Sequence, residues 1–156
     1  MTAYNVSHIG FLVHDLDAAI DRVGRTLRLR FLDPMLAEIP ILEEGKATTT
    51  MQLRVSWSSE GPPHVELIEA QGEGLYSKAK GEGFHHLGTW EDDFDALFAR
   101  LDGDRIFTEA VQRHPDRSVI ASYTVPDNLY GLRLEFISGA RRGEIDSWLR
   151  GDQWEA

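Results

Sequence analysis

The segment SHIGFLVHDLDAA at residues 7–19 recurs as HHLGTWEDDFDAL at residues 85–97, with a constant offset of 78 and no gap. The two copies share a histidine, a glycine two residues later, and several positions beyond them. The matched pairs are His8/His86, Gly10/Gly88, Asp15/Asp93, Asp17/Asp95, Ala18/Ala96 and Arg22/Arg100. Self-similarity of this kind indicates one structural unit that the chain uses twice.

Each copy predicts a strand, an aspartate-rich turn and a helix. Asp15 and Asp93 suit the N-cap position, where a side-chain oxygen accepts a hydrogen bond from a free backbone N–H. Apolar residues then recur at helical spacing in both copies. They are Leu16, Ala19, Ile20 and Val23 in the first copy, and Phe94, Leu97, Phe98 and Leu101 in the second.

Each copy also ends in a similar strand, HVELIEA at residues 64–70 and GLRLEFI at residues 131–137. Further strand-like segments lie between helix and final strand, with turns at prolines and glycines such as Pro34, Pro40 and Gly45. These segments are Arg28–Leu32 and Ala47–Trp57 in the first copy, and Arg105–Val111 and Ser118–Val125 in the second. The sequence therefore predicts an α+β fold made of two βαβββ modules.

The predicted modules span about residues 4–72 and 82–140, within a single domain at 1–140. No low-complexity linker separates them. A tail at residues 141–156 follows, with a possible short helix that carries Ile145, Trp148 and Leu149 on one side. Trp154 could dock on a neighbouring surface.

Composition excludes several classes of function. The 156 residues carry 16 Lys and Arg against 26 Asp and Glu, a formal charge of −10, which disfavours nucleic acid or an anionic membrane as partner. Without cysteine, the chain has no disulfide, thiolate metal site or cysteine nucleophile. No apolar run approaches the ~20 residues of a membrane span. The N-terminus lacks a signal-peptide pattern, so we expect a cytoplasmic protein.

Strand alternation brings four polar residues to equivalent positions in the repeat. Side chains alternate between the two faces of a strand, so one His or Glu stands opposite a mostly apolar face in each of the four repeated strands. The four are His8, Glu66, His86 and Glu135. Two imidazoles and two carboxylates that converge on one point suit a divalent metal with open coordination positions. The alternative is a pair of hydrogen-bonded core histidines with two exposed glutamates.

The chain resembles the vicinal oxygen chelate superfamily, which includes glyoxalase I, methylmalonyl-CoA epimerase, extradiol dioxygenases and bleomycin-resistance proteins. The resemblance rests on SHIGFLVHDLDAA, HVELIEA, GFHHLGTW and GLRLEFI, and it extends from Tyr4 to Ser138. It implies paired βαβββ modules around a cupped mixed sheet. It also implies metal ligands at the four positions above, with Zn, Ni, Co, Mn or Fe as the ion.

The resemblance is strongest to the methylmalonyl-CoA epimerase and glyoxalase I branches. Glu66 matches the glyoxalase I ligand set, whereas the HH pair of GFHHLG and the turn at Glu43–Gly45 are more epimerase-like. In the epimerase branch a Glu near this turn is the catalytic base, and Glu44 is the nearest match. Glu66 or Glu135 could instead take that role.

The implied reaction is non-redox proton abstraction next to a metal-polarised carbonyl, by an epimerase, isomerase or glyoxalase-type lyase. The expected substrate is a small molecule with a carbonyl or vicinal oxygens, and a homodimer is expected. The first alternative is a metal-free protein that binds or sequesters a small molecule such as an antibiotic. The second is an extradiol-type dioxygenase. Of the other histidines, we expect His85 to be structural and His14, His64 and His114 to be exposed.

Overall fold

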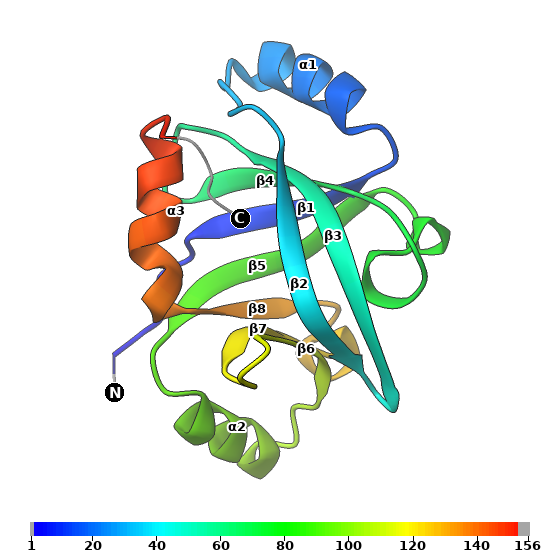
Figure 1. Ribbon diagram of the computed structural model, residues 1–156, viewed down its shortest axis with the longest axis vertical. Helices are drawn as coiled ribbons and strands as arrows, with labels where there is room; N and C mark the ends of the chain where they lie inside the picture. The colour runs from blue at the N-terminus through cyan, green and yellow to red at the C-terminus, as the bar shows by residue number, and fades with distance from the viewer. Residues whose placement is uncertain (1, 153–156) are drawn as a thin grey trace.

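A computed structural model describes residues 2–152 of the chain, so Trp154 lies outside the described residues. Eight strands form a closed barrel in the order β1-β4-β3-β2-β6-β7-β8-β5 (Figure 1). Each module supplies four consecutive strands of this barrel, and the modules meet at the β1–β5 and β2–β6 pairs. The predicted pair of βαβββ units is therefore confirmed.

The first module contains β1 (His8–Val13), α1 (Leu16–Leu27), β2 (Met35–Glu44), β3 (Ala47–Trp57) and β4 (His64–Glu69). The second contains β5 (Gly83–Glu91), α2 (Phe94–Gly103), β6 (Thr108–Arg113), β7 (Val119–Thr124) and β8 (Leu134–Ser138). A third helix, α3 (Arg142–Leu149), follows β8. None of the helices in residues 2–152 is both long and apolar enough to cross a lipid bilayer.

The two repeated helices begin where the aspartates predict. Asp15 accepts a hydrogen bond from the backbone N–H of Ala18, and Asp93 accepts one from Ala96. These bonds satisfy backbone donors that have no partner within the first turn of a helix. The helices lie outside the barrel, near opposite ends of the longest axis of the molecule (Figure 1).

The second strand of module one differs from the prediction. Arg28–Leu32 is not a strand, because Arg28 takes a left-handed conformation at the end of α1 and only Phe31 makes an isolated bridge, to Ser58. The strand is β2, which contains Pro40. Proline cannot donate to a ladder, but the pairing of β2 with β3 is irregular between Ile39 and Leu42, which accommodates it. β6 likewise begins three residues later than expected, at Thr108.

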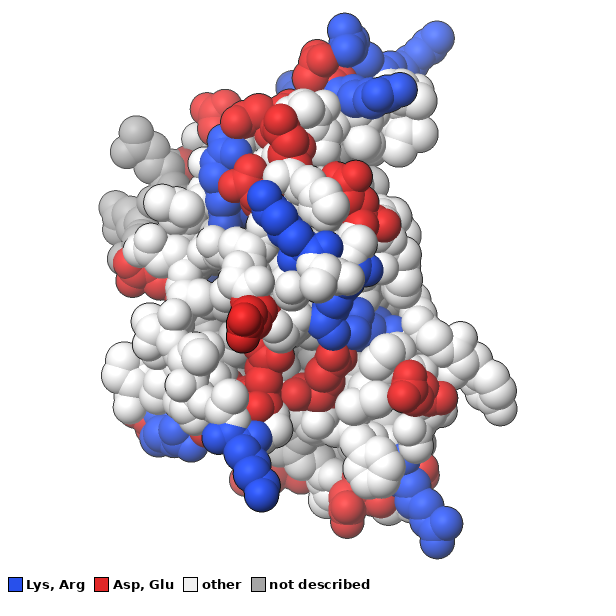
Figure 2. All heavy atoms as spheres, turned by 90° about the vertical axis from the view of Figure 1, so that its right-hand side faces the viewer, with Lys and Arg blue, Asp and Glu red and all other residues white. Residues whose placement is uncertain are grey.

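The barrel interior holds the largest cluster of buried apolar side chains. Its members come from both modules and include Leu12, Ile39, Leu53, Ile68, Ile120 and Tyr123. Outside the barrel, Leu97 and Leu101 of α2 pack on Phe136 of β8. On the described part of the face in Figure 2, Lys and Arg are interspersed with Asp and Glu rather than gathered in one basic area.

Candidate metal centre

The two strands that carry the repeated histidines pair directly. β1 and β5 run antiparallel, with His8 opposite Gly88 and Gly10 opposite His86. A Cβ on Gly10 would lie 2.2 Å from Cε1 of His86, so each ring occupies the space that the glycine of the other strand leaves open. The repeated His-x-Gly pattern is thus a reciprocal packing arrangement.

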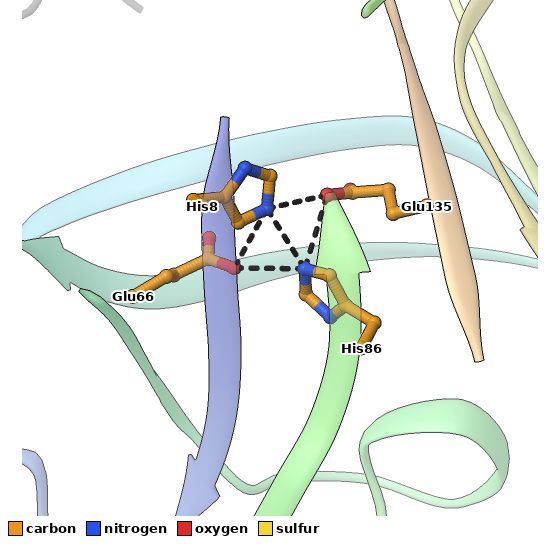
Figure 3. Close-up of side chains that lie close together, drawn as sticks. All are labelled: His8, Glu66, His86 and Glu135. Atoms are coloured by element: carbon orange, nitrogen blue, oxygen red, sulfur yellow. Dashed lines mark hydrogen bonds and ion pairs between the residues drawn. The ribbon is translucent and has the colours of Figure 1, made fainter. Parts of the chain in front are cut away.

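The two glutamates flank this pair from either side. β4 runs parallel to β1 with Glu66 beside Gly10, and β8 runs parallel to β5 with Glu135 beside Gly88. The four side chains come from four neighbouring strands and point toward one another inside the barrel (Figure 3). The structure therefore brings together all four residues that strand alternation selected.

The four side chains approach one another closely. Nε2 of His8 lies 2.8 Å from Nε2 of His86. Oε2 of Glu135 lies 2.8 Å from Nε2 of His8 and 3.1 Å from Nε2 of His86. Oε2 of Glu66 lies 3.5 Å and 3.2 Å from the same two nitrogens. Both imidazoles are completely buried, and all four ligand atoms lie within 4.8 Å of one another.

The arrangement fits a divalent metal. With metal–ligand bonds of about 2.1 Å, two ligand atoms lie about 3.0 Å apart at a right angle and about 3.4 Å apart at a tetrahedral angle. The observed separations of 2.8 to 3.5 Å cover this range. Oε2 of Glu66 is buried and has no hydrogen-bond partner. A cation between the four atoms would satisfy that oxygen.

Ser7 fixes the tautomer of His8. The Ser7 hydroxyl donates to the backbone oxygen of Gly88 at 3.1 Å, and Nδ1 of His8 lies 2.9 Å from the same hydroxyl oxygen. Because the hydroxyl proton is used toward Gly88, Nδ1 of His8 must be the donor. In the neutral ring, Nε2 then carries the lone pair and faces the other three residues.

His85 fixes the tautomer of His86 in the same way. Nε2 of His85 lies 3.0 Å from the backbone oxygen of Leu75, which can only accept, so this nitrogen carries a proton. Burial, followed by the charge of His86, lowers the pKa of His85 to about 4, which keeps its ring neutral at neutral pH. Nδ1 of His85 therefore accepts from Nδ1 of His86 at 2.8 Å. Neutral His86 then also presents an Nε2 lone pair to the centre.

In the absence of a metal, the cluster holds a proton. Burial opposes charge on His86, but the Glu135 carboxylate, which also pairs with the ring, and the nearby Glu66 carboxylate outweigh it and raise the pKa of His86 to about 9. Burial alone would raise the pKa of Glu135, yet the two histidines hold it well below its usual value. For Glu66 too, burial alone would raise the pKa, but His86 and His8 lower it. An imidazolium between two carboxylates therefore takes the place of a metal cation.

A buried chain of hydrogen bonds, formed by two tyrosine hydroxyls and one amide, ends at the Glu135 carboxylate. The Tyr123 hydroxyl makes a short hydrogen bond to Oε1 of Glu135. Tyr76 donates to the Tyr123 hydroxyl at 2.8 Å, and Nε2 of Gln112 donates to the Tyr76 hydroxyl at 2.7 Å. Burial, with the nearby Glu135 charge, raises the pKa of both tyrosines well above the usual value, so they stay protonated and act as donors.

Glu44 is not part of this cluster. Its Oε2 accepts a hydrogen bond from the backbone N–H of Leu75 at 2.9 Å. It also lines a groove of about 1040 Å³ formed by β2, β3 and the segment at residues 71–74, and none of the four clustered residues lines that groove. The observed contacts of Glu44 are with the turn that carries Leu75.

Other expectations for the polar residues need revision. His64 is half-buried rather than exposed, since Nδ1 lies 2.8 Å from the backbone oxygen of Ser58 and its ring packs on Trp57. His85 is structural, as expected, but contacts His86 directly. Sequence reasoning missed Tyr76, Gln112 and Tyr123 altogether. The sequence offered no distinct signal for Gln112 or Tyr123, because both strands, TEAVQR and VIASYT, contain other polar residues.

Comparisons with known proteins bear on the family and the fold of the chain. A family model described as Glyoxalase/Bleomycin resistance protein/Dioxygenase superfamily matches residues 7–120. No curated protein matches the sequence.

Several solved structures share the fold. A variant of Streptomyces coelicolor methylmalonyl-CoA epimerase in complex with 2-nitronate-propionyl-CoA is 19% identical, with a TM-score of 0.62 over 89% of this chain and 99% of that one. A hypothetical protein from Bacillus halodurans C-125 is 16% identical, with a TM-score of 0.63 over 88% and 95%. Methylmalonyl-CoA epimerase from Mycobacterium tuberculosis is 18% identical, with a TM-score of 0.58 over 85% and 86%.

Proposed function

Because this chain belongs to the glyoxalase/bleomycin resistance protein/dioxygenase superfamily, we propose that it is a divalent-metal-dependent enzyme with a non-redox reaction. The proposed reaction is removal of a proton next to a carbonyl, as in an epimerase, an isomerase or a glyoxalase-type lyase. The substrate is a small molecule with a carbonyl or vicinal oxygens. His8, Glu66, His86 and Glu135 are the proposed metal ligands.

One observation carries the proposal. Both imidazoles direct Nε2 toward a common centre, and each is held in that tautomer by a partner whose own proton is committed elsewhere. A histidine pair that served only the core would need no such arrangement, since either ring nitrogen could donate. Backing groups of this kind are typical of metal-binding histidines.

A bound divalent ion would supply Lewis-acid polarisation of the substrate carbonyl, which makes the neighbouring C–H more acidic. We assign the proton transfer to Glu66. Oε2 of Glu66 faces the metal position, and no described group outside the cluster hydrogen-bonds the Glu66 carboxylate, whereas Oε1 of Glu135 is held by Tyr123. Glu66 is therefore freer to accept a proton and return it, and Glu135 is more firmly held in place.

The remaining expectations stay predictions. Glu44 as base would require its carboxylate to leave the Leu75 N–H, so we place it second to Glu66. Methylmalonyl-CoA is a ligand in one epimerase structure of the same fold, so thioesters belong in the substrate panel beside free acids. A homodimer is still expected.

The proposal is tested by metal analysis and by proton exchange. Protein purified without chelator or a nickel column should carry about one divalent ion per chain, and His86→Ala should lose it. Metal-loaded protein in D2O should exchange the α-proton of a substrate from a panel of carbonyl acids and thioesters, followed by NMR. Glu66→Gln keeps an oxygen ligand but no base, so it should keep the metal and lose the exchange.

His114→Ala is the matched control, because His114 is exposed in a loop away from the cluster. It should behave as the wild type in both measurements. A wild-type protein that neither carries nor takes up metal would contradict the proposal and favour a metal-free binding protein. Oxygen consumption with a catechol by the iron-loaded protein would favour a dioxygenase.

A further inference from the structure

The helix α3 packs against the barrel beside the candidate metal centre. It lies beside the ends of β4, β1, β5 and β8 (Figure 1). Ile145 and Trp148 are its buried residues, and they pack in one cluster with Trp57 and Ile137. This apolar contact anchors the helix on the barrel.

Only one aromatic ring separates α3 from a proposed metal ligand. The ring centroids of Trp148 and Trp57 lie 6.2 Å apart, and those of Trp57 and His8 lie 4.4 Å apart. Both tryptophans are almost completely buried. The helix therefore forms part of the wall of the site.

The cavity beside the cluster is small and partly open, since the exposed Glu38 is among its lining residues. Its volume is about 60 Å³, and Glu66, Glu135, Trp57 and Ile145 are among the residues that line it. Pockets that bury drug-sized ligands have volumes of ~300–1000 Å³, and one water takes up about 30 Å³ of liquid. With α3 in place, the cavity has room for a few non-hydrogen atoms and none for the long arm of an acyl carrier.

The wall also contains one positively charged side chain. Arg141, at the start of α3, is the only Lys or Arg among the described residues that line the cavity, and Glu144 accepts from its Nε at 3.0 Å. Glu38 also lines the cavity, but it is exposed and accepts a hydrogen bond from Gln52 at 3.1 Å. A guanidinium pairs well with a carboxylate, so the wall favours a compact acid.

We propose that α3 sets the substrate class of this site, which is a compact carboxylic acid with an oxygen on the adjacent carbon rather than an acyl-carrier thioester. The inference rests on the proposed metal-dependent function. The side chains of Ile145 and Trp148 exclude bulky substrates, and Arg141 contacts the carboxylate of the compact acid. The packed helix also limits the access of bulk water to the proton transfer from that side.

The test uses the full chain loaded with Co2+, whose visible absorption reports ligands that approach the ion. Cobalt content is measured first, and oxalate and propionyl-CoA are then titrated as the compact and bulky probes. We expect oxalate to change the spectrum of the wild type at concentrations at least tenfold below any effect of propionyl-CoA. Trp148→Ala should reduce this preference at least tenfold, and Arg141→Gln should weaken oxalate binding at unchanged cobalt content.

Asp146→Ala is the control on the same helix, because Asp146 is exposed, and it should keep the wild-type preference. Thermal unfolding shows whether each variant is folded, and Trp148→Phe provides a milder change if Trp148→Ala is not. Bound cobalt with equal responses to the two probes overturns this inference alone. Failure to bind cobalt overturns the proposed function, and this inference with it.

Discussion

Gly88 lies directly opposite His8 across the β1–β5 pair, and a Cβ on Gly88 would lie 1.8 Å from Cε1 of the His8 ring. Real Cβ atoms do not approach another atom so closely, and both the His8 ring and Gly88 are buried. The position of the imidazole therefore depends on the absence of a side chain on the neighbouring strand.

Gly88→Ala is expected to displace His8 and to lower metal affinity at least tenfold, with a loss of thermal stability from the crowded interior. Metal affinity by competition with a coloured chelator, and the melting temperature, measure both effects. Gly103→Ala makes the same change at the end of α2, where a Cβ would meet nothing within 4 Å, and should be nearly neutral. Unchanged metal affinity in Gly88→Ala would contradict the packing argument.

His85→Phe removes the acceptor that holds Nδ1 of His86. The His86 ring can then present the wrong tautomer, and we expect metal affinity to fall about 10- to 100-fold. His85→Asn restores an acceptor near the position of Nδ1 and should recover part of the loss. If Phe and Asn were equally harmful, His85 would contribute packing alone.

The stability of the metal-free protein should fall as pH rises from 6.5 to 9. The pKa of His86 is raised from its usual 6.5 to about 9 in the folded state, so the protonated ring stabilises folding below pH 6.5. This stabilisation is lost as pH rises through the folded value, and the full shift corresponds to on the order of 3 kcal/mol. Urea unfolding in the presence of a chelator measures it.

The metal-loaded protein should show the opposite dependence over the same pH range, because a metal must displace the proton from His86. His86→Gln should abolish the alkaline loss in the metal-free protein. A metal-free wild type that is equally stable at pH 6.5 and pH 9 would show that His86 is not protonated in the cluster.

Tyr123→Phe is expected to destabilise the metal-free protein by about 1–3 kcal/mol. The change removes the donor to Oε1 of Glu135 and the acceptor for the Tyr76 hydroxyl, and both are buried. Urea unfolding measures the loss. Tyr130→Phe removes a hydroxyl from a fully exposed ring and serves as the control, with no expected change. Equal stabilities for the two variants would exclude an energetic role for the hydroxyl chain.

The sequence predicted the four clustered residues because two simple rules sufficed. The repeat identified equivalent strands, and side-chain alternation placed His8 and Glu66 on inward faces. The supporting residues follow from neither rule. Tyr123 meets Glu135 because β7 pairs with β8, and His85 meets His86 through its side-chain conformation. Contacts of this kind depend on tertiary packing, which single-sequence patterns do not encode.

The misplaced second strand has a similar cause. Pro40 and Pro34 indicate turns by local preference, yet β2 forms through Pro40 because its neighbours Ile39 and Leu42 are buried in the barrel core. Burial of these side chains outweighs the missing backbone donor of one proline. Local propensity therefore located the helices better than it located this strand.

The division of the four donors between the two modules has a consequence for how such a site could arise. Each module supplies one imidazole and one carboxylate, so a single βαβββ unit by itself offers only two of the four donors. A shorter ancestral polypeptide that encoded one unit would need to associate with an identical copy to enclose an ion. Gene duplication and fusion would then convert that assembly into one chain and free each half to diverge. The spacing from His to Glu, 58 residues from His8 to Glu66 and 49 from His86 to Glu135, illustrates such divergence, as do the separate partners Ser7 and His85.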